Sequence, residues 1–76
     1  PWRNWKADLQ NFIQKKIQET PFYEILNETG PDHHKVFTIA VCTKEGILGE
    51  GSGESKKEAQ QEAAKDAMQK LGIIDS

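Results

Sequence analysis

The stretch of sequence that decides the predicted fold is Gly49-Glu50-Gly51-Ser52-Gly53-Glu54-Ser55-Lys56-Lys57-Glu58. Ser55 and Glu58 have the S-x-x-E spacing of a capping box. In that motif the serine oxygen accepts a hydrogen bond from one free backbone N–H at the start of a helix, and the glutamate reaches back to another. The spacing predicts that a helix begins at Ser55.

The first turn of this helix contains Lys56 and Lys57, whose charge has the wrong sign for the positive end of a helix dipole. Each is expected to cost a few tenths to about 1 kcal/mol of helix stability. Local rules are usually broken where function requires it. Free N–H groups beside two ammonium groups form an anion site, and a polyphosphate backbone is a suitable anion for a convex surface. The alternative is a solvated helix end whose lysines only aid solubility.

The rest of this helix is rich in alanine as far as Leu71, which predicts close packing on a neighbouring element. Its apolar side consists of Ala59, Ala63, Ala64, Ala67, Met68 and Leu71. Gly72 is expected to follow the helix as its C′ residue, with Ile73 making the apolar contact of a Schellman end. Residues 47–52 are predicted to be a strand whose glycines permit a bulge or the close approach of another backbone.

An earlier helix is predicted from Trp5, in a segment that Pro21 ends. Its apolar residues recur at helical spacing and are Trp5, Leu9, Phe12, Ile13 and Ile17. The opposite side is polar but uncharged and consists of Ala7, Gln10, Asn11 and Gln14. Amide groups both donate and accept hydrogen bonds, so this face suits ribose hydroxyls and base edges in a shallow groove. An ordinary solvated face is the alternative.

Two further strands are predicted between this helix and the glycine-rich strand. Residues 22–29 are rich in aromatic and β-branched side chains, and Tyr23 and Ile25 are expected to point inward. In residues 35–43 alternate side chains lie on one face of a half-buried sheet; they are Phe37, Ile39 and Val41. The predicted turns are Gly30-Pro31-Asp32-His33-His34 and Lys44-Glu45-Gly46.

The order helix, three strands, helix predicts an α+β fold, a two-layer α-β-β-β-α domain. Its three-stranded antiparallel sheet is expected to have both helices packed on one face. The 76 residues allow one such domain, which we place at residues 5–72, with 1–4 as a linker remnant and 73–76 as a C-terminal tail. The chain begins without methionine, which suggests a piece of a longer protein.

Composition narrows the classes of function. The chain has 10 Lys and Arg against 12 Asp and Glu, so any nucleic-acid binding must depend on local clustering. No apolar run approaches the roughly 20 residues of a membrane span and no signal peptide is present, so we expect no membrane partner. The single cysteine, Cys42, is expected to be a buried thiol in a reducing compartment, which favours a cytoplasmic protein.

No catalytic, metal or cofactor site is predicted in the chain. Asp32, His33 and His34 are adjacent, and adjacent side chains rarely converge on one ion. The glycines of residues 49–53 precede a helix, but they lack the pattern of a P-loop. No base is placed by the sequence beside the cysteine, so a nucleophilic site cannot be assembled.

Two motifs at this separation resemble the double-stranded RNA-binding domain, over about residues 5–71. They are Gly30-Pro31-Asp32-His33 with Phe37, and Gly49-x-Gly51-x-Gly53-x-Ser55-Lys56-Lys57-x-Ala59 with Ala63-Ala64. Within this family the chain is most similar to the carboxy-terminal domain of bacterial ribonuclease III. The shared features are Tyr23-Glu24-Ile25, the G-P-x-H loop and the run Gly51-Ser52-Gly53-x-Ser55-Lys56-Lys57-Glu58-Ala59.

The resemblance implies that the chain binds A-form duplex RNA by its shape, through three regions. The first helix would meet one minor groove, the loop at His33 the next, and the second helix the phosphates across the major groove between them. The residues implied to bind RNA are Gln10, Gln14, Pro31, Asp32, His33, Ser55, Lys56, Lys57 and Gln60. This footprint agrees with the chemistry above, because wide minor grooves display 2′-hydroxyls and lysines suit phosphates.

The resemblance further implies a substrate-targeting module of a ribonuclease III that cleaves duplex RNA in ribosomal and messenger RNA processing. Cleavage would belong to an acidic, magnesium-dependent domain before Pro1, in a parent that is a homodimer. The isolated domain is expected to be a monomer.

Three positions depart from the family pattern and predict weaker binding than in a typical member. Glu54 stands where a basic residue is often found, Gln60 where many members have a third lysine, and Ala7 where a side-chain donor is frequent. The rival hypothesis is a protein-interaction module of the same fold, with weak or no RNA binding, that dimerises through its sheet or through Trp2 and Trp5. The acidic balance favours this rival, whereas the joint presence of the glutamines, His33 and the two lysines argues against it.

Overall fold

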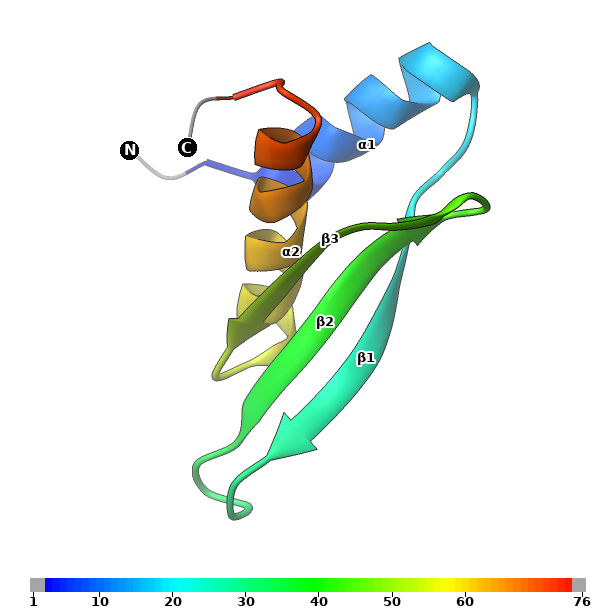
Figure 1. Ribbon diagram of the computed structural model, residues 1–76. Helices are drawn as coiled ribbons and strands as arrows, with labels where there is room; N and C mark the ends of the chain where they lie inside the picture. Colours follow the sequence, from blue (N-terminus) through cyan, green and yellow to red (C-terminus); the bar gives the residue numbers. More distant parts are fainter. Residues whose placement is uncertain (1–2, 75–76) are drawn as a thin grey trace.

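A computed structural model describes residues 3–74 and confirms the predicted α+β fold. The elements are α1 (Trp5–Ile17), β1 (Phe22–Thr29), β2 (Val36–Thr43), β3 (Gly46–Gly53) and α2 (Lys56–Lys70). The strands form one antiparallel sheet in the order β1-β2-β3. Both helices lie on the same side of this sheet (Figure 1). Trp2, named above in the rival hypothesis, lies outside the described residues.

The helices begin and end as their flanking residues dictate. At α1 the side chain of Asn4 accepts a hydrogen bond from the Ala7 N–H, a cap that the sequence analysis did not identify. At α2 the Ser55 hydroxyl oxygen accepts from the Glu58 N–H at 3.0 Å, which confirms the serine half of the capping box. The glutamate reaches back one residue farther than the motif describes, because its Oε1 accepts from the Glu54 N–H at 3.0 Å.

The end of α2 has the predicted Schellman geometry. Gly72 has a φ of 77°, and its N–H donates to the Gln69 carbonyl. The Ile73 N–H donates to the Met68 carbonyl at 2.9 Å, and the Ile73 side chain packs on the core.

The backbone of α2 lies directly on the backbone of β3. All four alanines of the predicted apolar side are fully buried: Ala59, Ala63, Ala64 and Ala67. A Cβ added at Gly49 would stand 2.5 Å from the Ala67 nitrogen, and one added at Gly51 would collide with the Ala63 nitrogen. The glycines of β3 and the alanines of α2 therefore form the two sides of one close contact.

The core is completed by α1, which packs on α2. Leu9 and Ile13 form one cluster with Val41 and four residues of α2, which are Ala63, Ala64, Ala67 and Met68. The register between β2 and β3 shifts by one residue, so that Leu48 has no partner on β2. This bulge lies beside Gly49, as the glycine content of the strand suggested.

Three apolar positions expected on the core side are largely exposed. Ile17, the last residue of α1, is 41% exposed. Ile25 lies on the inward face of the sheet, opposite the buried Ile39, yet it is 49% exposed. The reason is that α2 lies over β3 and β2, so the inward face of the edge strand β1 remains open beyond Tyr23. Leu71 is 44% exposed because it is the C-cap residue, at the end of the alanine-lined contact.

Replacing Gly51 by Ala is expected to destabilise the fold by about 1–3 kcal/mol, because the new methyl group meets helix backbone that cannot move aside. Chemical denaturation of Gly51→Ala measures this loss. Ser52→Ala, on the neighbouring exposed residue of the same strand, is the control and should stay within about 1 kcal/mol of wild type. Equal stability of the two variants would contradict the close contact.

Candidate nucleic-acid interface

The polar face of α1 is solvent-exposed along its whole length. Ala7, Gln10, Asn11 and Gln14 are all exposed, and Leu9 and Ile13 on the opposite side are buried. Because the amides of Gln10 and Gln14 are one turn apart on a helix anchored by its apolar side, they form a short, fixed row of hydrogen-bonding groups. The structure thus presents both predicted minor-groove residues to solvent.

The start of α2 also faces solvent, with Ser55, Lys56 and Lys57 exposed. Within residues 3–74 neither lysine forms a salt bridge, so both ammonium groups are available to an anion. The Lys56 ammonium lies 5.9 Å from the centroid of the Phe37 ring, which limits the directions it can take. The Ser55 oxygen already accepts a hydrogen bond from Glu58, but its O–H remains able to donate.

A shallow hollow of about 300 Å³ joins these two regions. It is lined by Asn4, Lys6, Ala7, Gln10, Lys57 and Gln61. Two of these residues are cationic, three have amide groups and none has a carboxylate. Gln10 of α1 and Lys57 of α2, which the sequence analysis assigned to separate regions, therefore border one surface whose chemistry suits phosphate and ribose.

The third predicted region, the β1–β2 loop, stands apart from the other two. Pro31, Asp32 and His33 are exposed in a turn that the Gly30 φ of 93° and a hydrogen bond from the His34 N–H to the Pro31 carbonyl define. The loop lies at the end of the sheet remote from α1 (Figure 1), in a molecule whose longest dimension is 40 Å. This separation is what contact with two successive minor grooves requires.

Charge in this loop is only partly favourable to RNA. The Lys35 ammonium pairs with Glu28 at 2.7 Å and lies 3.8 Å from the Asp32 carboxylate. The hydrogen bond from Lys35 and its charge lower the pKa of Glu28, so the pair stays ionised. Lys35 is therefore largely neutralised by Glu28 and Asp32. The Asp32 carboxylate repels phosphate, but it can accept a hydrogen bond from a ribose 2′-hydroxyl.

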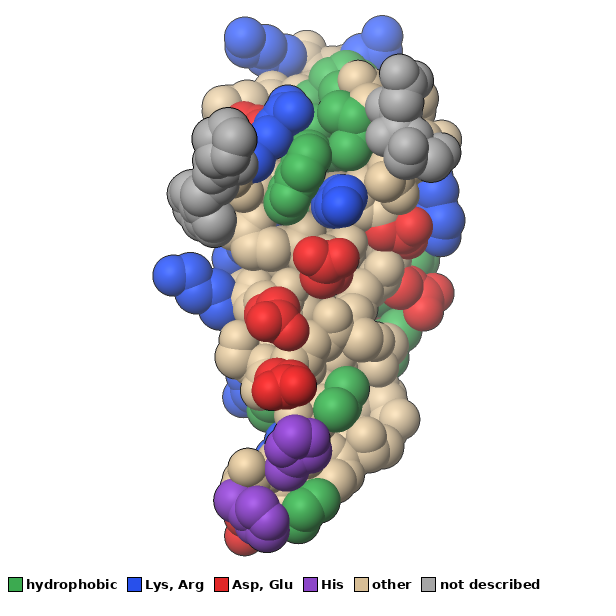
Figure 2. Space-filling view, turned by 90° about the vertical axis from the view of Figure 1, so that its left-hand side faces the viewer, with side chains coloured by type: hydrophobic (Ala, Val, Ile, Leu, Met, Phe, Trp, Pro, Cys, Tyr) green, Lys and Arg blue, Asp and Glu red, His purple; other side chains and the backbone are tan. Residues whose placement is uncertain are grey.

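Negative charge collects on another side of α2. Glu54, Glu58, Glu62 and Asp66 follow one another at four-residue spacing; we name them the acidic stripe. Figure 2 shows acidic side chains in a row on this face, above the histidines of the loop. Burial opposes the ionisation of Asp66, but hydrogen bonds from the Glu50 N–H and the Lys70 ammonium outweigh it and lower the pKa of Asp66. Asp66 therefore stays ionised at neutral pH despite its partial burial.

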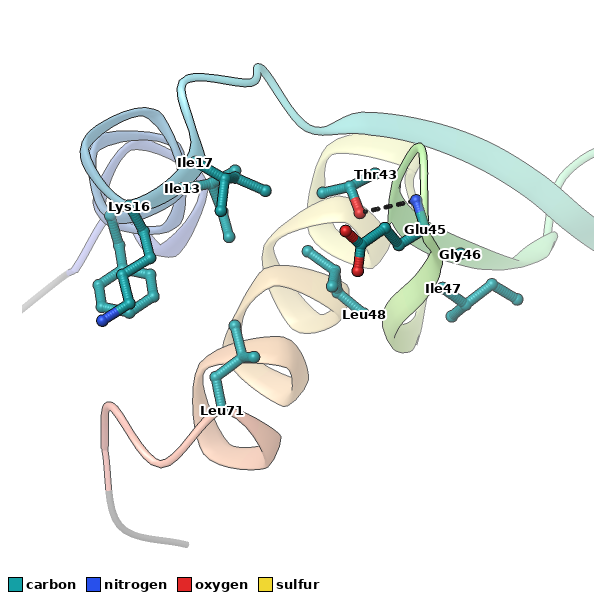
Figure 3. A pocket seen from close by; sticks show the side chains of 10 residues that line it. Ile13, Lys16, Ile17, Thr43, Glu45, Gly46, Ile47, Leu48 and Leu71 are labelled. Carbon is teal, nitrogen blue, oxygen red and sulfur yellow. Dashed lines mark hydrogen bonds between the residues drawn. The ribbon is translucent and has the colours of Figure 1, made fainter.

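A larger hollow, of about 500 Å³, lies at the opposite end of α2 from the lysines (Figure 3). Its walls are mostly apolar and include Ile13, Ile17, Ile47, Leu48 and Leu71. Lys16 and Glu45 stand at its rim, and the Glu45 N–H donates to the Thr43 hydroxyl at 3.3 Å. This hollow includes none of the predicted RNA-binding residues.

Two further findings concern chemistry that the described residues 3–74 do not offer. No three His, Cys, Asp or Glu side chains among them are grouped closely enough to hold a metal ion. No helix in the same range has the length and apolar character that crossing a bilayer demands.

Cys42 is buried, and this burial raises the pKa of its thiol. The nearby Glu24 carboxylate raises it further. Cys42 is therefore an unreactive core residue, as the sequence analysis expected.

One residue of this surface was missed by the sequence analysis. Lys6 lines the hollow between the helices and extends its ammonium to the Gln60 side chain. The sequence did indicate that Lys6 lies on the same side of the helix as the glutamines, because it is four residues before Gln10 and eight before Gln14. Lys6 was overlooked because the amide face was defined by the absence of charge.

Comparison with known families and proteins agrees with this geometry. A family model described as a double-stranded RNA binding motif matches residues 5–71. Ribonuclease 3 of Protochlamydia amoebophila is 56% identical over 73 residues, covering 96% of this chain and 30% of the relative. Ribonuclease 3 of Desulforamulus reducens is 49% identical over 69 residues, covering 91% and 28%. The chain thus spans about three tenths of the length of these curated relatives.

Solved structures show the same arrangement of elements. A structure of Arabidopsis HYL1, reported for its implications for miRNA processing, superimposes with a TM-score of 0.79 at 32% identity. The match covers 92% of this chain and 99% of that one. Dicer from Pichia stipitis matches with a TM-score of 0.69 at 26% identity, over 86% of this chain and 31% of its own.

Changing both Lys56 and Lys57 to Ala is expected to weaken duplex RNA binding and to flatten its salt dependence by roughly two phosphate contacts. Thermal stability should hold or rise, because two cations leave the positive end of the helix. Titrations at several salt concentrations measure both quantities. The control removes two lysines elsewhere, Lys44 and Lys70, and should change the slope much less. An unaltered affinity and slope in the first variant would exclude the phosphate role.

Glu54 precedes the helix cap and is exposed beside the two lysines, so Glu54→Arg is expected to tighten duplex binding about fivefold at low salt, or about 1 kcal/mol. The gain should shrink as salt rises, and helix stability should fall slightly. Glu62→Arg, the same change two turns farther along the acidic stripe, is the control and should gain less. Wild-type affinity for Glu54→Arg at low and high salt would mean that Glu54 lies outside the interface.

Proposed function

The chain belongs to the family of double-stranded RNA binding motifs, and from this premise we propose that it is the RNA-targeting module of a ribonuclease III. It binds duplex RNA through its shape. The proposal for the whole protein is supported by relatives that are named Ribonuclease 3 and that match nearly all of this chain. The corresponding domain would hold a duplex while another part of the parent cleaves it.

The observation that supports this function best is the hollow shared by α1 and α2. Gln10 and Lys57 border it together, with amide groups and lysines and without a carboxylate. An amide row meets ribose hydroxyls in the minor groove, and the lysines meet the phosphates beside it. His33, on the distant loop, adds a second minor-groove contact in this proposal. Pro31, Asp32, Ser55 and Gln60 complete the proposed RNA-binding surface.

Cleavage, in this proposal, is performed outside the present chain. The parent is proposed to be a homodimeric endoribonuclease that acts in ribosomal and messenger RNA processing. Its catalytic domain would supply the carboxylates and the magnesium ions, which stabilise the charge that develops in phosphoryl transfer. The present chain would contribute affinity and orientation, and Cys42 would remain a free thiol in the cytoplasm.

The rival role as a protein-interaction module gains no specific support from the described residues. That role was expected to use the sheet, or Trp2 and Trp5. The Trp5 ring is half-buried, with the Arg3 guanidinium 4.6 Å and the Lys65 ammonium 5.7 Å from its centroid. Trp5 is thus occupied by contacts within the chain.

The proposed function is tested by comparing three ligands of equal length: duplex RNA, duplex DNA and single-stranded RNA. Wild type is expected to prefer duplex RNA strongly, because the amide row of Gln10 and Gln14 meets 2′-hydroxyls that DNA lacks. Changing both glutamines to Ala should reduce RNA binding and part of this preference while the fold stays intact, since Ala is a better helix former.

Gln69→Ala provides the matched control, because Gln69 lies beside the acidic stripe on the other side of α2. It should leave binding to all three ligands unchanged. Equal binding of wild type to the RNA and DNA duplexes would overturn the proposed function.

A further inference from the structure

Position 60 is where the chain lacks a positive charge that its family often has. Gln60 replaces the third lysine there, which led the sequence analysis to expect weaker RNA binding. In the structure a lysine from the other helix occupies the same place. The ammonium of Lys6 donates a hydrogen bond to Gln60 Oε1 at 2.7 Å, across 54 residues of chain.

The backbone around Lys6 is fixed to α2 by amide groups. The Lys6 N–H donates to Gln61 Oε1 at 3.2 Å, and Gln61 Nε2 in turn donates to Asn4 Oδ1 at 3.0 Å. The same Asn4 oxygen caps α1. Because these bonds tie the first turn of α1 to the second turn of α2, the position of the Lys6 side chain is set by both helices.

The charge of Lys6 is not neutralised by its neighbours. Among residues 3–74 no carboxylate lies within ion-pair distance of its ammonium. The ammonium lies 5.1 Å from the centroid of the Tyr23 ring, and burial raises the pKa of Tyr23 to about 12, so the phenol stays neutral. An ammonium has three N–H donors, and Gln60 accepts from one of them. The others remain for a further acceptor.

We propose that Lys6 is a phosphate-binding residue of the RNA interface, which supplies from α1 the positive charge that α2 lacks at position 60. Its ligand is a phosphodiester of the duplex, bound at the hollow that Lys6 and Lys57 line together. Gln60 orients the ammonium. This inference rests on the proposed function, and it explains how a net-acidic chain with only two lysines at the start of α2 assembles a third phosphate contact.

The first test is Lys6→Ala in the whole chain, titrated with duplex RNA at several salt concentrations. Affinity should fall on the order of fivefold at low salt, and the salt slope should decrease by about one phosphate contact. Lys44→Ala is the matched control. Lys44 lies in the β2–β3 turn, at the opposite end of the sheet from the β1–β2 loop, and its loss should change neither quantity.

A second variant separates phosphate binding from the bridge between the helices. In Lys6→Ala/Gln60→Lys a lysine on α2 restores the positive charge at this place. The hydrogen bond between the side chains of residues 6 and 60 stays broken. RNA affinity and salt slope should recover, whereas any loss of thermal stability caused by Lys6→Ala should persist. The gain from Gln60→Lys should also be larger in the Lys6→Ala background than in wild type, because one phosphate is served by either lysine.

The outcomes distinguish the two proposals. A wild type that does not bind duplex RNA would overturn the proposed function and this inference with it. A wild type that binds, together with a Lys6→Ala variant of equal affinity and slope, would overturn the Lys6 assignment alone. The same conclusion would follow if the double variant stayed as weak as Lys6→Ala, since the lysine would then act only by joining the helices.

Discussion

The contact between the backbones of β3 and α2 is the constraint on which the rest of this domain depends. It exists because Gly49 and Gly51 have no side chain and because the facing residues of α2 are alanines. Contacts of this kind gain dispersion energy over many atoms and tolerate almost no added volume. They therefore fix the height and angle of α2 on the sheet more rigidly than long, flexible side chains would.

The contact between β3 and α2 also fixes the position of the binding surface, because few residues separate the two. Gly53 is the last residue of β3, and Ser55, the cap of α2, follows it by two residues. The lysines of the first turn are thus held by the same contact that closes the core. The amide row of α1 is held indirectly, since α1 packs on α2 and is joined to it by Asn4 and Gln61. A groove reader that recognises shape needs such fixed spacing, because it has few base contacts by which to adjust.

Much of this could be predicted from the sequence, and the failures have a common physical cause. The serine cap, the Schellman end and the alanine contact are local patterns, and the structure shows each of them. The alternation expected in β2 is not seen in its burial, because both faces of this central strand are covered from Ile39 to Thr43. Ile25 was misjudged because its burial depends on how far α2 extends sideways over the sheet, which no local pattern encodes. The contact of Lys6 with Gln60 could not be predicted, because the two residues are 54 positions apart and belong to different helices. The sequence predicted three separate regions of the interface. It did not predict that α1 and α2 together line one surface.

The acidic stripe gives the domain a face that repels phosphate (Figure 2), on another side of α2 from the lysines that attract it. Three of its carboxylates lie on α2 and the fourth, that of Glu54, directly precedes the helix cap, and their field fades over a Debye length of about 8 Å. A duplex that approaches from this side meets repulsion, whereas one that approaches the lysines is attracted. The charge distribution therefore favours one orientation of the domain before any contact is made.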